Sequence, residues 1–134
     1  MKTVLRLVLI SIGIWAVPFL ISIPMHSNNG DLLVNYWLFK IIMVSTLTGT
    51  AVGLFRWFYF NSSSSELYVY WFILVGLVSL TIQLLLDSIT VIPMGAMTWQ
   101  LYIQEIGIIY LVLIPISIIV GKQVTKGVRH EQED

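Results

Sequence analysis

Four long apolar segments, separated by short polar stretches, constrain the fold of this chain more than any other feature of its sequence. They cover residues 4–23, 33–59, 67–92 and 101–121. Each is long enough to cross the apolar core of a bilayer, which takes about 20 helical residues. Only 10% of the residues are charged, against about 25% in an average soluble domain. The sequence therefore predicts an all-α membrane protein with one transmembrane domain over residues 1–134.

The positions of the basic residues predict how the four spans are oriented. Short connections place consecutive helices side by side, so we expect an up-down four-helix bundle. Cytoplasmic segments of membrane proteins are enriched in Lys and Arg. In this chain basic residues lie at the two termini and beside the second connection, whereas the first and third connections have none: Lys2, Arg6, Arg56, Lys122, Lys126 and Arg129. We therefore expect both termini to be cytoplasmic, in a multi-pass protein of the plasma (inner) membrane.

Several classes of chemistry lack the residues they need in this sequence. Seven basic and seven acidic residues give no net charge, so nucleic acid is not an expected partner. There is no Cys, and His26 and His130 both lie outside the spans, which leaves no ligand set for zinc or haem in the membrane. No catalytic constellation is evident. We expect a protein without enzymatic activity, cofactor or metal, whose first partner is the lipid bilayer.

Three charged residues lie inside the predicted spans, where each costs about 2.5–3.5 kcal/mol at the bilayer centre. Lys40 lies sixteen residues before Arg56, Asp87 sixteen after Trp71, and Glu105 seventeen before Lys122. At a helical rise of 1.5 Å per residue, all three lie about 24–25 Å from the cytoplasmic interface. The sequence therefore predicts a cluster of Lys40, Asp87 and Glu105 at one depth in the outer leaflet.

Such a cluster has two interpretations. Two close carboxylates do not both ionise readily in a medium of low dielectric constant, so the cluster could bind a proton or a cation, or relay a proton. Alternatively, the three charges lie only a turn or two from the outer interface. They could then be a structural ion pair that locks the helices together, with Lys40 extending toward the headgroups.

The third span has a polar face. Its small and polar residues recur every three or four positions, which is the repeat of one side of a helix: Gly76, Ser79, Gln83, Asp87 and Thr90. In a membrane this face is expected to point into the bundle. We predict that Ser79 and Gln83, together with Tyr102 of the fourth span, line a polar path or provide interhelical hydrogen bonds.

The second span has a face of small residues. Ser45, Gly49 and Gly53 follow one another at four-residue spacing, which permits close contact with another helix. This face predicts a homo-oligomer or a place in a larger membrane complex.

Aromatic residues near the two interfaces are interpreted as two aromatic belts. The outer belt is Tyr36, Trp37, Trp99 and Tyr102, and the inner belt is Trp57, Tyr59, Tyr68, Tyr70 and Trp71.

The two halves of the chain also share a short sequence pattern. Ile23-Pro24-Met25 ends the first span and Ile92-Pro93-Met94 ends the third. The repeat predicts two parallel hairpins, residues 1–61 and 66–121, related by an axis along the membrane normal. The alternative is that a convenient helix stop occurs twice by chance.

One stretch resembles a known family. It carries Asp87, then Pro93-Met94-Gly-Ala-Met97, then Tyr102-Ile-Gln-Glu-Ile-Gly107-Ile-Ile-Tyr110, with Pro115 later. The pattern is similar to that of small uncharacterised four-helix integral membrane proteins of bacteria and archaea, mainly over residues 74–120. Members often carry Arg where Ile109 stands. The resemblance implies the four-helix fold and a role for Asp87, and implies no activity.

Two functions follow from these residues. The first is binding or transport of an ion, a proton or a small polar solute through Lys40, Asp87 and Glu105. The second is a non-catalytic accessory or structural subunit of a larger membrane complex, in which the cluster only holds the helices together. Neutralising the carboxylates separates the two, because only the first function requires them to be exchangeable.

Overall fold

The computed structural model describes residues 2–26, 32–61, 69–90 and 99–133. In these segments the regular structure is helical, apart from one isolated bridge between His26 and Leu32. Four helical stretches are long and apolar enough to cross a membrane: Thr3–Met25, Tyr36–Phe60, Val69–Thr90 and Ile108–Lys126. The chain therefore has the four apolar helices of a multi-pass membrane protein. Most of the residues that connect the predicted spans lie outside the described segments.

Nearby residues determine where the first long helix ends and where the second begins. Helix α1 (Lys2–Ser22) passes into a 3-10 turn, η1 (Ile23–Met25), which contains Pro24. Helix α2 (Tyr36–Phe60) begins three residues after the predicted start of the second span, because the Asn35 side chain caps it and accepts a hydrogen bond from the Trp37 amide at 2.9 Å. Of the two Ile-Pro-Met sequences, only the first lies in the described residues.

Helix α3 (Val69–Thr90) is continuous, whereas the fourth predicted span is not one regular helix. That span consists of α4 (Trp99–Tyr102), a π turn η2 (Ile103–Gly107), α5 (Ile108–Tyr110) and α6 (Leu113–Glu133). Pro115 has no amide hydrogen to donate to the Leu111 carbonyl, and the Ile114 amide donates to it instead at 3.3 Å. This tighter turn separates α5 from α6.

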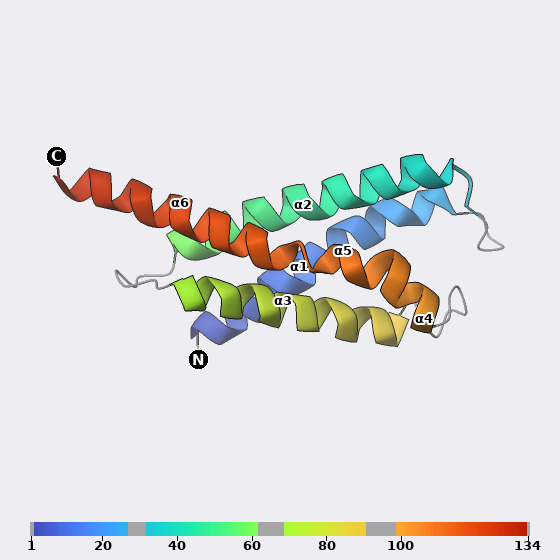
Figure 1. Ribbon diagram of the computed structural model, residues 1–134, viewed down its shortest axis with the longest axis horizontal. Helices are drawn as coiled ribbons and strands as arrows, with labels where there is room; N and C mark the ends of the chain where they lie inside the picture. Colours follow the sequence, from blue (N-terminus) through green and yellow to red (C-terminus); the bar gives the residue numbers. More distant parts are fainter. Residues whose placement is uncertain (1, 27–31, 62–68, 91–98, 134) are drawn as a thin grey trace.

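The long helices lie lengthwise beside one another (Figure 1). Helix α1 packs against α2 and α3, and α6 packs against the same two helices. Both labelled chain ends lie toward the same side of Figure 1, where α6 continues beyond the other helices. The core between the helices is rich in aromatic side chains, of which Phe55, Phe58, Tyr59 and Phe72 are almost fully buried.

Helices α3 and α6 approach each other closely because glycines lie at their contact. A Cβ atom on Gly76 would be 2.8 Å from the Cα of Ile114, and one on Gly121 would be 2.4 Å from the Phe72 ring. The Ser117 hydroxyl donates to the Phe72 carbonyl at 2.7 Å and also forms a hydrogen bond with the Tyr59 hydroxyl. These contacts fix α2, α3 and α6 to one another along their shared half.

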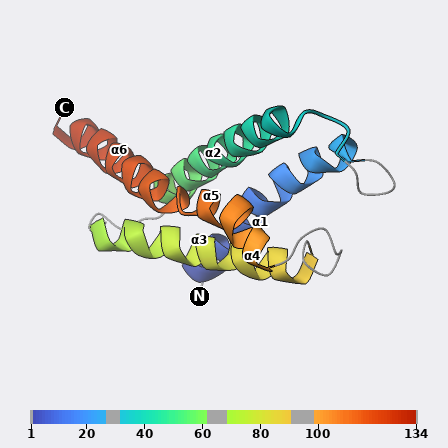
Figure 2. The same cartoon turned by 45° about the vertical axis from the view of Figure 1, so that its right-hand side comes forward.

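Toward their other ends the helices diverge. Figure 2 shows that the beginning of α2 and the end of α1 spread away from α3 and α4. The interrupted fourth span, with α4, η2 and α5, lies at this diverging end. The helices are therefore closer together in one half of the fold than in the other, which we call the more open half for the spread of its helices; Asp87 is buried there, near the end of α3.

Candidate functional site

The polar face of α3 points into the bundle, as the sequence predicts. Gly76, Ser79, Gln83 and Asp87 are all buried. Thr90 is partly buried, and its hydroxyl donates to the Leu86 carbonyl of its own helix. The spacing of these residues follows the helical repeat, so the burial of one member brings the others to the same side.

Asp87 is the most deeply buried charged residue in the described part of the chain, with 3% of its surface exposed. Its Oδ1 atom accepts a hydrogen bond from Trp15 Nε1, and its Oδ2 atom accepts one from each hydroxyl of Tyr102 and Tyr110. All three bonds measure 2.7 Å, a length typical of bonds to a carboxylate. Neutral donors from α1, α4 and α5 thus offset the loss of hydration around this charge.

The π turn explains how two tyrosines of one span reach the same oxygen. The Ile108 amide bonds to the Ile103 carbonyl, five residues back, so η2 holds one residue more than an α-helical turn. In a regular α-helix, Tyr102 and Tyr110 would point in directions about 80° apart. One extra residue in the turn reduces this to about 20°. Both hydroxyl groups therefore point toward Asp87.

A polar column continues from Asp87 along the contact between α1 and α3. The Gln83 Nε2 atom donates to the Ser11 carbonyl at 2.9 Å, and the hydroxyls of Ser11 and Ser79 share a hydrogen bond of 2.9 Å. Ser11, Ser79 and Gln83 are each fully buried. The Gln83 Oε1 atom is buried and has no hydrogen-bond partner. Among the described residues it is the one buried side-chain polar atom without a hydrogen-bond partner.

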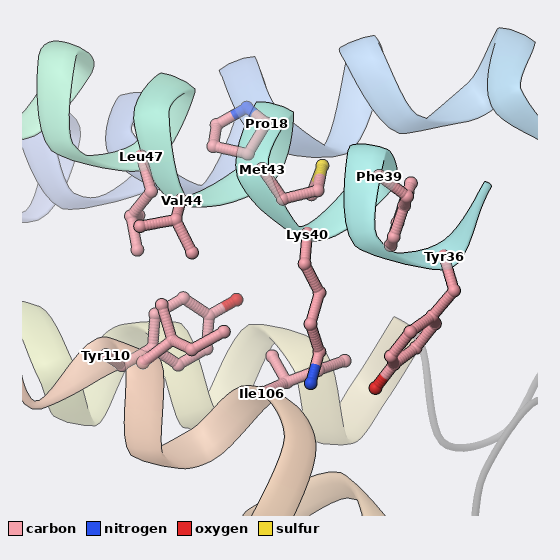
Figure 3. A pocket seen from close by; sticks show the side chains of 10 residues that line it. Pro18, Tyr36, Phe39, Lys40, Met43, Val44, Leu47, Ile106 and Tyr110 are labelled. Atoms are coloured by element: carbon pink, nitrogen blue, oxygen red, sulfur yellow. The ribbon is translucent and has the colours of Figure 1, made fainter. Parts of the chain in front are cut away.

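A pocket of about 110 Å³ lies beside this site, between α2 and the fourth span (Figure 3). Its walls are mostly apolar, with Phe39, Met43 and Ile106 among them. Ten residues line the pocket in all, and three of them have polar side-chain groups, Tyr36, Lys40 and Tyr110; the others are Pro18, Phe39, Met43, Val44, Leu47, Ile106 and Ile109. Figure 3 shows the Lys40 side chain extending from α2 toward Ile106. The Lys40 Nζ atom lies 4.8 Å from the centre of the Tyr36 ring.

Tyr110 connects this pocket to the buried carboxylate. Its side chain forms part of the pocket wall, and its hydroxyl donates to Asp87. The sequence assigns Lys40 and Asp87 to one cluster. In the structure Tyr110 is the residue between them, since it lines the pocket with Lys40 and donates to Asp87. Glu105 belongs to η2, and its side chain is outside the part of the chain whose side chains the structure describes. A direct cluster of all three charges stays a prediction.

The small-residue face of α2 lies on the outside of the bundle. Ser45, Gly49 and Gly53 are exposed, and a Cβ atom on either glycine would meet nothing within 4 Å. No helix in the described part of the chain occupies this face, so its expected contact with another helix would have to come from a second molecule.

The aromatic-belt interpretation is wrong for two tyrosines. Tyr102 is fully buried and bonded to Asp87, which agrees with its other predicted role as a polar lining residue. Tyr59 is also buried, and its hydroxyl bonds to Ser117. The hydroxyl group of each tyrosine has a hydrogen-bond partner inside the bundle. A tyrosine near the end of a span can therefore be buried rather than exposed at the surface. Trp37, Trp57 and Trp99 are exposed.

Sequence reasoning missed two of the three Asp87 donors. Trp15 stacks on Phe19 and donates to Asp87, and nothing in the sequence pattern around it indicates this contact. Tyr110 lies 23 positions from Asp87 in sequence, which hid their contact. The sequence pattern that carries the family resemblance contains both Tyr102 and Tyr110. This pattern was the signal that could have indicated the two tyrosines as neighbours of Asp87.

The donor set limits the chemistry of the site. In the described part of the chain, no group of three or more His, Asp, Glu or Cys side chains could hold a metal ion. An ionised carboxyl group only accepts hydrogen bonds, whereas a protonated one must also donate. In this structure Asp87 accepts a hydrogen bond from each of its three neighbours. Comparisons with known proteins found no matching family model, no matching curated protein and no matching solved structure.

Proposed function

We propose that this protein is a small membrane transport protein that binds and releases a proton at Asp87 while a small solute occupies the adjacent pocket. The observation that carries the proposal is the double role of Tyr110. It donates to the buried carboxylate and it forms part of the pocket wall. A change in the charge of Asp87 alters the hydrogen bond to this tyrosine, and so alters the wall that a solute would contact.

The pocket lining supports a particular class of solute. Its walls are mostly hydrocarbon and aromatic, and Tyr36, Lys40 and Tyr110 are the lining residues that carry polar groups. Such a lining fits a small molecule with an apolar body and one group that accepts hydrogen bonds. In this proposal Lys40 and Glu105 belong to the same functional cluster as Asp87, with Lys40 on the pocket side.

The proposed orientation follows from the distribution of basic residues. We place the protein in the plasma (inner) membrane as an up-down bundle with both termini in the cytoplasm. This orientation puts the more open half of the bundle, with Asp87 and the pocket, toward the outer leaflet. The proposed family is that of the small uncharacterised four-helix membrane proteins, on the strength of the residues between 74 and 120.

The proposal is tested by infrared titration of the purified protein in nanodiscs. We expect a carboxylic-acid C=O band that appears as the pH is lowered and is absent in Asp87→Asn. Asp134→Asn removes a carboxylate at the end of the sequence and serves as the matched control, which should retain the band. If Asp87 stays ionised wherever the protein is folded, the proposal is wrong.

A second function is supported by the same bonds. Asp87 joins α3 to α1, α4 and α5, so it could act only as a lock in an accessory subunit of a larger membrane complex. In that case Asp87→Asn should lower the melting temperature strongly, and the wild-type carboxylate should show no titration. Proton binding with only a modest stability loss in the variant would favour transport over this alternative.

A further inference from the structure

The unpartnered oxygen of Gln83 is the feature that the proposed function leaves unexplained. Gln83 is fully buried, and its Nε2 atom is already bonded to the Ser11 carbonyl. That bond orients the amide and leaves Oε1 as a free acceptor. Buried acceptors in proteins almost always have a donor, and here the alternative to a partner is hydrocarbon. A donor is therefore missing from the arrangement that the structure describes.

A protonated Asp87 would supply such a donor. Gln83 lies four residues before Asp87 on the same buried face of α3, where side chains are neighbours. The arrangement described above suits the ionised carboxyl, which accepts from Trp15, Tyr102 and Tyr110. A protonated carboxyl has one O–H group that needs an acceptor. The Trp15 indole cannot accept a hydrogen bond, and each tyrosine hydroxyl would have to turn away from its present role as a donor to accept one.

We propose that Gln83 Oε1 accepts a hydrogen bond from the carboxyl O–H group of Asp87 when Asp87 is protonated. The inference rests on the proposed function, because it requires Asp87 to bind a proton. An O–H bond forms on Asp87 as the proton arrives, and the new O–H group donates to Gln83 Oε1. The proton leaves by the reverse step, and nothing is oxidised or reduced. The site thus has two complete hydrogen-bonding arrangements, and Gln83 is a positioning residue in one of them.

Few other groups near Asp87 take part in this equilibrium. From α1 the carboxylate meets Trp15, which does not titrate, and from α4 and α5 it meets the hydroxyls of Tyr102 and Tyr110. Lys40 of α2 lines the pocket on the far side of Tyr110. The one buried side-chain acceptor without a partner among the described residues therefore lies on the same helix as the acid itself.

Infrared spectroscopy in nanodiscs also tests this inference, with a different readout. Gln83→Met keeps an unbranched side chain of similar length but removes the acceptor. We expect the carboxylic-acid C=O band of Asp87 to move to higher wavenumber in Gln83→Met, because its O–H group then lacks a strong acceptor. Gln123→Met, an exposed position on α6, is the matched control and should leave the band in place.

A measurement on the unsubstituted protein removes any dependence on how the Gln83 variant folds. With the side-chain carbonyls of glutamine labelled with ¹³C, we expect one glutamine band to shift as Asp87 is protonated, and this shift to be absent in Asp87→Asn. A protonated Asp87 whose band is the same in Gln83→Met, with no glutamine shift, overturns the role of Gln83 and leaves the proposed function intact. A failure of Asp87 to protonate at all overturns both.

Discussion

Tyr110 and Asp87 are joined by a hydrogen bond of 2.7 Å between the tyrosine hydroxyl and Oδ2 of the carboxylate, and the same tyrosine forms part of the pocket wall. Tyr102 donates to the same oxygen without lining the pocket. The two tyrosines therefore form a natural pair for separating the stability of the site from its connection to the pocket.

We expect Tyr102→Phe and Tyr110→Phe each to lower the free energy of unfolding by about 1.5–3 kcal/mol, the usual contribution of a hydrogen bond to a charged group. Denaturation of the purified protein in mixed micelles measures this loss. In the Asp87→Asn background both substitutions should cost less, since the charged acceptor is gone. Equal costs in the two backgrounds would contradict a hydrogen bond to an ionised carboxylate.

Glycine substitutions should separate the inner packing of the bundle from its outer face. Gly76→Ala places a Cβ atom 2.8 Å from the backbone of Ile114, so α3 and α6 must move apart. We expect a loss of about 1–3 kcal/mol in unfolding free energy. Gly49→Ala, where the Cβ atom meets nothing within 4 Å, is the matched control and should leave the melting temperature unchanged or slightly raised. Similar losses in both variants would be inconsistent with this packing.

The exposed face of α2 predicts self-association. The chain contains no Cys, so an introduced thiol has no partner within its own molecule, and a product of twice the mass identifies a bond between two copies. If two molecules meet through Ser45, Gly49 and Gly53, mild oxidation of Gly53→Cys in membranes should give a disulfide-linked dimer. Leu85→Cys, exposed on α3, serves as the control and should remain monomeric. Cross-linking at Leu85 but not at Gly53 would place the contact elsewhere.

Thiol labelling also tests the orientation in the membrane. Leu33→Cys and Lys126→Cys lie at exposed positions near opposite ends of the bundle. In intact cells we expect a membrane-impermeant maleimide to label only Leu33→Cys, and Lys126→Cys to react after permeabilisation. Labelling of Lys126→Cys in intact cells would reverse the topology that the basic residues predict.

Much of the helical architecture could be predicted from the sequence because lipid imposes simple rules on length and polarity. Four apolar segments predicted the four helices, and the spacing of Ser79, Gln83 and Asp87 predicted which face of α3 is buried. A helix in a bilayer satisfies its own backbone, so such patterns translate directly into structure.

The donors around Asp87 could not be predicted in the same way. Trp15 and Tyr110 lie 72 and 23 positions from Asp87 in sequence, so their contacts depend on how the helices pack rather than on helical periodicity. The π turn changes the direction of each side chain that follows it, which a regular helical wheel does not anticipate. Amphipathic aromatic residues also suit both a headgroup region and a buried carboxylate, so composition alone could not separate these two places.

The extra residue in η2 has a consequence for the ancestry of this chain. A π turn differs from an α turn by one residue, so a single-codon insertion into a regular helix is enough to produce one. A relative that kept the aspartate but lacked the insertion would need its second tyrosine one position earlier to reach the same oxygen. Tyrosines seven apart in an unbroken helix, or eight apart across a bulge, would mark two branches that preserved one contact by different routes.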